Sequence, residues 1–263
     1  MTRLRGVGLK LTRARDHLDA LNNEIRYWSA VNPYRLDAKF DSKNLAYFPQ
    51  PSPGYVVTIV EESRLPGDRL SAVIGDCIHN LRAALDHLAW SLVVAGNGTP
   101  NEGTYFPVRL DRLSENGKLR PLPLTGAVDQ GALTIIEDLQ PYNALDDPSL
   151  HELAILSELD NIDKHRFLNP VGMTVIQASI SLSDPAGGAL FHQFVPGTFK
   201  RDAAVAFFPF REDQGAMNVD GNLTPLIALD DFSPLAGQPI SGVLETLIAY
   251  VATEVVRPLS RFL

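Results

Sequence analysis

The most regular feature of the chain is a long segment, residues 68–95, in which apolar and polar positions separate with helical periodicity. On a wheel of about 100° per residue one face is apolar; it carries Ile74, Cys77, Ile78, Leu81, Ala84, Leu85, Leu88 and Leu92. The other face carries Asp76, His79, Asn80, Ala83, Asp86, His87 and Trp90, with Arg82 at its margin. This pattern predicts a long helix with a buried stripe, which ends at the glycine-rich residues 96–98.

Shorter periodic segments predict four more helices. Spacings of three and four indicate helices over 9–29, 130–139 and 240–256, and Pro258 is expected to stop the last of these. Another helix is expected over 148–167, with Pro148 in its first turn. It is apolar around most of its circumference, so we expect it to be buried and to pair with the 68–95 helix in the core.

Alternating positions predict strands elsewhere. Residues 35–47 and 54–62 form an expected hairpin, and further strands are expected over 176–183, 190–195, 203–210 and 223–229. A short extended piece, 104–108, precedes a polar loop with a short helix, 109–126. Because helices and strands are segregated along the chain, we expect one α+β domain. It comprises an N-terminal helix and hairpin, a helical core over 66–168, an antiparallel β-rich segment over 170–232 and a terminal helix over 240–257.

Composition narrows the class of protein. The 263 residues are 45% hydrophobic, which fits a packed globular core. A single cysteine excludes a disulfide framework and a zinc site built mainly on thiolates. The net charge of −8 argues against a general nucleic-acid coat, and no apolar run is long enough to span a bilayer. We therefore expect a cytoplasmic protein that contacts neither DNA nor a membrane.

Two blocks of sequence, 75–88 and 156–166, concentrate the residues that could carry chemistry. They hold three of the six histidines, and the second block gathers its charged residues at the end of its helix: Glu158, Asp160, Asp163, Lys164, His165 and Arg166. A solvated helix face usually carries Lys, Glu and Gln, so a face of Asp, His and Asn suggests selection for interactions. The alternative is a hydrogen-bonded polar seam between two buried helices. Under either interpretation we expect the two blocks to contact each other.

The two blocks resemble a family of uncharacterised bacterial and phage proteins that pair an HNLRxALDHL helix with an IDKHR helix. The first block also resembles the signature of the HEPN superfamily, an arginine followed by a histidine after four to six residues, here Arg82 and His87. This resemblance implies a metal-independent ribonuclease of a bacterial or phage conflict system, with RNA as its partner and no cofactor. It also implies a homodimer in which both motifs face one cleft.

The resemblance assigns roles to named residues. His87 would relay a proton to or from the ribose 2′-hydroxyl or the leaving oxygen, and Arg82 would hold the phosphate. Asp86 or Asp163 would orient the imidazole, while Lys164 and Arg166 would extend the grip on phosphate. We therefore take Arg82, His87 and Asp86 as catalytic candidates. The binding candidates are Asp76, His79, Asn80, Asp160, Asp163, Lys164, His165 and Arg166.

Two other functions remain open from the sequence. One is a non-catalytic, dimeric binding or scaffold protein that uses the same polar helices as a seam. The other is an enzyme with a metal held by Asp76 and His79 from the first block and by Asp160, Asp163 and His165 from the second. Cys77 lies on the apolar stripe, so we interpret it as a core residue and not as a nucleophile. If Arg82 and His87 are accessible to solvent in a cleft, the nuclease is favoured. If partners within the chain bury both, the scaffold is favoured.

Overall fold

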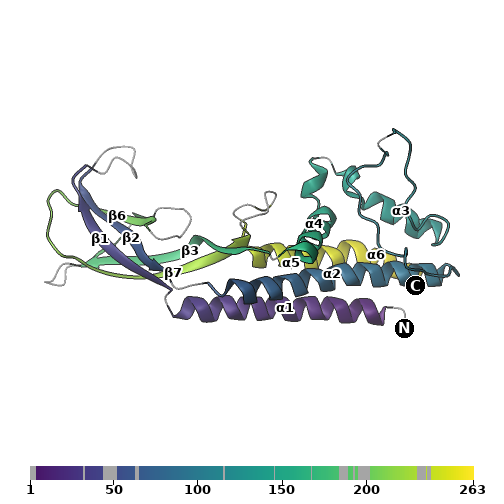
Figure 1. Ribbon diagram of the computed structural model, residues 1–263, viewed down its shortest axis with the longest axis horizontal. Coiled ribbons are helices and arrows are strands. Elements are labelled where there is room, and N and C mark those ends of the chain that lie inside the picture. The colour runs from purple at the N-terminus through teal and green to yellow at the C-terminus, as the bar shows by residue number, and fades with distance from the viewer. Residues whose placement is uncertain are drawn as a thin grey trace.

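The computed structural model describes residues 4–31, 33–43, 52–62, 65–114, 116–144, 146–166, 168–183, 189–191, 193–194, 202–229, 235 and 238–263. Its architecture is α+β, as predicted: helices pack together at one end and antiparallel sheets project from the other. Both termini lie at the helical end (Figure 1). All candidate residues of both blocks lie on helices except Arg166, which directly follows one, so the candidate site belongs to the helical end.

Two long helices form the base of the helical end. Helices α1 (Arg5–Ala30) and α2 (Gly67–Ala95) lie side by side and antiparallel (Figure 1). Every apolar position predicted on the 68–95 stripe is buried. Helix α1 begins at Arg5, four residues before its predicted start, because Val7 extends its apolar stripe into the contact with α2 and is only 1% exposed.

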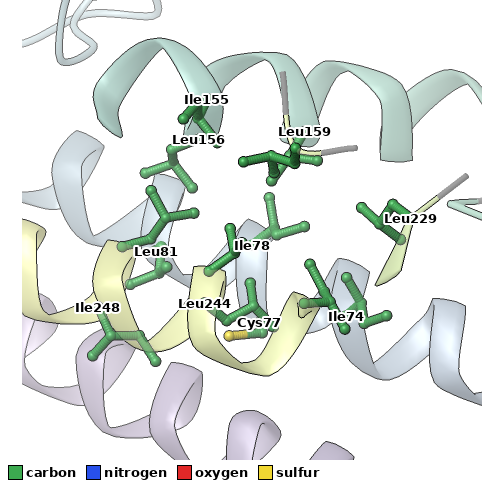
Figure 2. Close-up of a cluster of buried hydrophobic side chains, with 14 of the residues drawn as sticks. Ile74, Cys77, Ile78, Leu81, Ile155, Leu156, Leu159, Leu229, Leu244 and Ile248 are labelled. Carbon is green, nitrogen blue, oxygen red and sulfur yellow. The ribbon is translucent and has the colours of Figure 1, made fainter. Parts of the chain in front are cut away.

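The core lies where three elements meet over the buried stripe of α2. Helices α4 (Glu152–His165) and α5 (Ile240–Tyr250) and strand β7 (Asn218–Leu229) close on this stripe. Figure 2 shows Ile78 and Leu81 of α2 facing Leu156 of α4 and Leu244 of α5. The expected contact between α2 and α4 is therefore present. Helix α1 is the more extensive partner of α2.

The strands form two antiparallel sheets. The predicted hairpin is confirmed as β1 (Tyr34–Asp41) and β2 (Gly54–Glu62), although positions 44–47 of its first strand lie outside the described residues. One sheet has the order β1-β2-β6-β5, with β6 at Ala204–Pro209 and β5 at Gln193–Phe194. The other has the order β4-β3-β7, with β4 at Ala189–Phe191 and β3 at Pro170–Ser183. The predicted strand over 190–195 is thus two short strands in different sheets, since β4 pairs with β3 and β5 pairs with β6.

Three helix predictions need correction. Pro148 opens a 3₁₀ turn, Pro148–Leu150, and α4 begins two residues later, where the His151 side chain caps it. Pro258 does not end the terminal helix, because a wider π turn, Val251–Val256, accommodates the proline and leads into Arg257–Leu259. The described part of 109–126 contains no helix, and Leu113 and Leu119 form an antiparallel bridge there instead. Helix α3 (Gln130–Asp138) agrees with its prediction.

Candidate functional site

The two sequence blocks meet where α4 crosses α2. Gly75 of α2 faces Asp163 of α4 so closely that a Cβ at Gly75 would lie 2.3 Å from Oδ1 of Asp163. One turn further along α2, Nδ1 of His79 lies 3.7 Å from Oδ1 of Asp160. The predicted contact between the blocks is therefore confirmed, and a glycine permits the close crossing.

The carboxylates of this crossing differ in their environments. The side chain of Asp160 is only 6% exposed, and its Oδ2 accepts a 2.5 Å hydrogen bond from Nζ of Lys164. Asp163 is half-buried, and its pKa is raised by that burial and by the negative charges of Asp160 and Asp76. The crossing is thus a polar seam in which Lys164 pairs with the buried Asp160, whereas Asp163 makes no ion pair with a Lys or Arg of the described residues.

Arg82 and Asp86 form a clamp on the backbone of Phe106. Nη2 of Arg82 donates to Oδ1 of Asp86 at 2.9 Å and to the Phe106 carbonyl at 2.7 Å. The same carboxylate oxygen accepts the Phe106 N–H at 3.0 Å. Both backbone groups of a fully buried residue are thereby satisfied by side chains of α2. The Arg82 side chain is only 14% exposed, and its guanidinium group makes these structural hydrogen bonds.

Gln140 repeats this arrangement a few residues along the same segment. Its amide group is buried, donates to the Pro107 carbonyl at 3.0 Å and accepts the Arg109 N–H at 3.1 Å. Residues 106–109 belong to no strand. The side chains of Arg82, Asp86 and Gln140 supply the hydrogen bonds that a neighbouring strand would otherwise make. This is the physical role of the extended piece predicted over 104–108.

His87 lies on a different side of α2 from Arg82. Five residues along a helix correspond to about 140° of rotation, so the two side chains diverge. The imidazole is exposed and lies over Gly6 of α1, where a Cβ would approach Nδ1 to 2.6 Å. Asp86 is engaged by Arg82 and Phe106, and Asp163 lies three turns away at Gly75, so neither orients His87. The structure therefore does not bring the three catalytic candidates together around one point.

The remaining binding candidates are spread around the crossing. Asp76 is exposed, and its carbonyl accepts from the Asn80 amide, whose oxygen in turn accepts from Lys10 at 3.2 Å. His165 and Arg166 are exposed at the end of α4. Within the part of the chain that the structure describes, no group of three or more Asp, Glu, His or Cys side chains is placed to hold a metal ion. The five residues of the metal hypothesis therefore do not converge.

Cys77 occupies the core, as predicted. Burial raises the pKa of its thiol to about 12, and Sγ donates to the Ala14 carbonyl of α1. A thiol in this environment stays protonated at neutral pH and is a poor nucleophile.

A polar hollow of about 310 Å³ opens beside the clamp. Its walls come from α2, from α4 and from residues 105–108, and the polar groups among them are Arg82, Tyr105, Ser157, Glu158, Asp160, Asn161 and Lys164. Tyr105 is 44% exposed, and the lining carries charges of both signs. This hollow suits a small polar group better than an apolar one.

Sequence reasoning did not identify Gly75, Phe106 or Gln140 as parts of the site. Each acts through a partner far along the chain: 24 residues separate Arg82 from Phe106, and 33 separate Gln140 from Pro107. No local pattern marks such contacts. The only available signal is the polar type of Gln140 between Leu139 and Pro141, at the end of an apolar helix.

Comparisons of this chain with models of protein families, with curated proteins and with solved structures find no match. The site must therefore be interpreted from its own geometry. Among the helices of the described ranges, none is both long and apolar enough to cross a membrane.

Proposed function

We propose that this chain is a non-catalytic, homodimeric binding or scaffold protein whose two polar blocks hold its helices in a fixed arrangement. The observation that carries the proposal is the Arg82–Asp86 clamp on Phe106. A phosphate-binding arginine needs its fork available to the substrate, whereas this fork already serves a buried backbone. The polar seam between α2 and α4 supports the same interpretation, because its buried carboxylate is paired within the chain.

A HEPN-like ribonuclease requires a different arrangement. Arg82 and His87 must act on one phosphate, which requires Arg82 to leave Asp86 and Phe106 and the two side chains to converge. Moving Arg82 away leaves Asp86 without its cation and the Phe106 carbonyl without its donor, at a cost of about 2–4 kcal/mol for this half-buried pair. The nuclease remains a prediction that activity measurements decide.

The deciding experiment is incubation of the pure protein with mixed RNAs, with and without EDTA. The proposal predicts no cleavage by the wild type in either condition. The His87→Ala variant is the test, and His17→Ala on α1, outside both blocks, is the matched control. EDTA-resistant cleavage that His87→Ala removes and His17→Ala retains would overturn the proposal in favour of the nuclease. EDTA-sensitive cleavage would instead favour the metal hypothesis built on Asp76, His79 and Asp163.

The dimeric part of the proposal is supported by the exposed side of α2. Trp90 is 49% exposed and Val94, one turn further, is 36% exposed. A large aromatic side chain left in solvent is a common anchor of protein interfaces. Sedimentation equilibrium should give twice the chain mass for the wild type, and Trp90→Ala should shift the equilibrium toward the monomer. A monomeric wild type at high concentration would refute this part.

A further inference from the structure

Three exposed leucines gather in residues 109–120, a segment that the proposed function does not use. Leu110 is 48% exposed, Leu113 is 49% exposed and Leu119 is 68% exposed. Isolated exposed apolar side chains are normal on protein surfaces, but a contiguous group of them marks an interaction surface. The question is therefore what covers this group.

The leucines stand on a hydrogen-bonded hairpin. Leu113 and Leu119 are directly paired across an antiparallel bridge, so their side chains project from the same face about 5 Å apart. Ser114 N–H donates to the Lys118 carbonyl at 2.8 Å, and Arg120 N–H donates to the Arg112 carbonyl at 3.2 Å. Gly117 provides the turn with a φ of +69°, a conformation that favours glycine.

The hairpin is also fixed to the helical end. The Arg109 guanidinium donates to the Arg120 carbonyl at 2.8 Å, and Nε of Arg112 lies 3.4 Å from the Glu137 carboxylate of α3. The hairpin rises beyond α3 at the outer edge of the molecule (Figure 1). Leu113 and Leu119 are therefore exposed on an element at the edge of the molecule, which one ion pair joins to α3.

The charge of this segment is opposite to that of the whole chain. Residues 109–120 contain four cations (Arg109, Arg112, Lys118 and Arg120) and two acids (Asp111 and Glu115), and Arg112 is paired with Glu137, while the chain as a whole carries −8. Lys118 and Arg120 are exposed and flank Leu119, so they project from the opposite face of the hairpin to the leucine pair. Charges act mainly within a Debye length of about 8 Å, so a surface that meets this hairpin experiences its cations more strongly than the distant acids.

We propose that the hairpin over 109–120 docks on the surface of an anionic lipid bilayer. Leu113 and Leu119 enter the boundary between headgroups and acyl chains, and Lys118 and Arg120 extend their long side chains from the other face of the hairpin to lipid phosphates. An exposed apolar pair on a projecting hairpin fits a deformable bilayer without requiring a preformed pocket, which favours lipid over a protein groove. This inference goes beyond the proposed function and departs from the expectation of no membrane contact, which rested on the absence of a spanning segment.

The test is co-sedimentation of the full chain with sucrose-loaded vesicles. Vesicles of phosphatidylcholine alone are compared with vesicles of phosphatidylcholine and phosphatidylglycerol. The wild type should bind the anionic vesicles and bind the neutral ones weakly, and added salt should weaken the binding. The Leu113→Ser/Leu119→Ser variant should lose about tenfold or more in partition coefficient. Lys118→Glu/Arg120→Glu should lose the preference for anionic lipid.

A matched control is available on other parts of the surface. Leu9 on α1 is 62% exposed and Leu150 is 50% exposed, so Leu9→Ser/Leu150→Ser removes two equally exposed leucines and should leave vesicle binding unchanged. Circular dichroism and the thermal midpoint verify folding, and Leu113→Ala/Leu119→Ala replaces the serine variant if that variant fails to fold. Absence of vesicle binding, or binding that the leucine variants retain, would overturn the proposal. So would a lipid-free change in oligomeric mass caused by the leucine variants, because the leucines would then cover a second copy of the chain.

Discussion

At the scale of single residues, the backbone of Phe106 depends on two charged side chains. Arg82 and Asp86 are one helical turn apart, so they present a donor and an acceptor side by side, in the manner of a neighbouring strand. The helix alone places Arg82 and Asp86 side by side, whereas the tertiary fold brings Phe106 to them. The same arginine that suggests phosphate binding in the sequence is a backbone ligand in the structure.

Replacing Arg82 tests this role. Arg82→Ala leaves the Phe106 carbonyl without its donor and Asp86 without its cation, so we expect a loss of about 2–4 kcal/mol in the free energy of unfolding. Denaturant unfolding of Arg82→Ala, Asp86→Ala and the double variant measures the loss and the coupling within the pair. Arg35→Ala is the matched control, because the Arg35–Glu61 pair is about two-thirds exposed and solvent screens it, so its loss should change stability much less. Equal losses for Arg82→Ala and Arg35→Ala would contradict the clamp.

Asp163 gives a prediction about pH. Its folded-state pKa is raised above the ordinary value of 3.8 by burial and by Asp160 and Asp76, so between those two values the folded state binds more protons than the unfolded chain. Stability therefore falls as pH rises through that window, and the loss is complete above the folded-state pKa. Asp163→Asn removes the charge and should be more stable than the wild type at neutral pH, with the difference vanishing at and below about pH 4.

Asp147 provides the opposite case. Its pKa is lowered by hydrogen bonds from Ser149, so its contribution to stability is present at neutral pH and is lost as pH falls below 3.8. At neutral pH the thermal midpoint should therefore be higher than wild type for Asp163→Asn and lower than wild type for Asp147→Asn. Both differences should shrink as the pH is lowered through the acid range. Differences from wild type with the same sign in both variants would show that the pKa of Asp163 is not raised in the folded state.

At the scale of elements, α4 depends on a histidine at its first turn. Nδ1 of His151 accepts the Leu153 N–H at 3.2 Å, and Nε2 lies 3.3 Å from the Tyr250 hydroxyl of α5. Burial lowers the pKa of this imidazole below 6.5. A proton on Nδ1 would also remove the acceptor that caps the helix.

The cap predicts a loss of stability on mild acidification. Because the folded-state pKa of His151 lies below 6.5, the unfolded chain takes up the proton first, and stability decreases as pH falls from 6.5 toward the folded-state value. His151→Asn keeps a capping oxygen that does not titrate, so it should lose less stability than the wild type between about pH 7.5 and 5.5. Tyr250→Phe keeps the histidine and should retain the pH dependence. Denaturant midpoints at the two pH values measure the loss of stability in each protein. An equal loss in wild type and His151→Asn would contradict the prediction.

The elements also show how far sequence patterns extend. Helix α2 and the first hairpin were predictable because periodicity reports which face is buried, and every predicted stripe residue of α2 is buried. Periodicity does not report the partner, so the division of 190–195 between two sheets and the dominant contact of α2 with α1 could not be foreseen. For the site, the contact of the two blocks followed from their shared polarity. The clamp did not, because the spacing of Arg82 and His87 is the same whether the arginine holds phosphate or Phe106.

At the scale of the whole molecule, one connected core links the helices and the sheets. Buried residues of α1, α2, α4 and α5 form a single cluster with Tyr55, Val57, Ile59 and Phe208 of the first sheet. We therefore expect thermal unfolding in one cooperative transition, with equal calorimetric and van't Hoff enthalpies. Hydrogen exchange should give similar opening free energies in β2 and α2. A sheet that melts first would divide the chain into two domains.

The order of the strands has a consequence for biosynthesis. The first sheet joins β2, early in the chain, to β6, and the hydroxyl of Tyr55 is held by Asp213, 158 residues later. At roughly 5–20 residues per second, a ribosome needs on the order of 10 seconds to make the intervening chain. Throughout that interval the hairpin of β1 and β2 has a free edge that awaits its neighbour. A nascent chain of this protein therefore passes through a long period in which a chaperone, or an identical chain on the same messenger RNA, can occupy the edge of β2 before β6 exists.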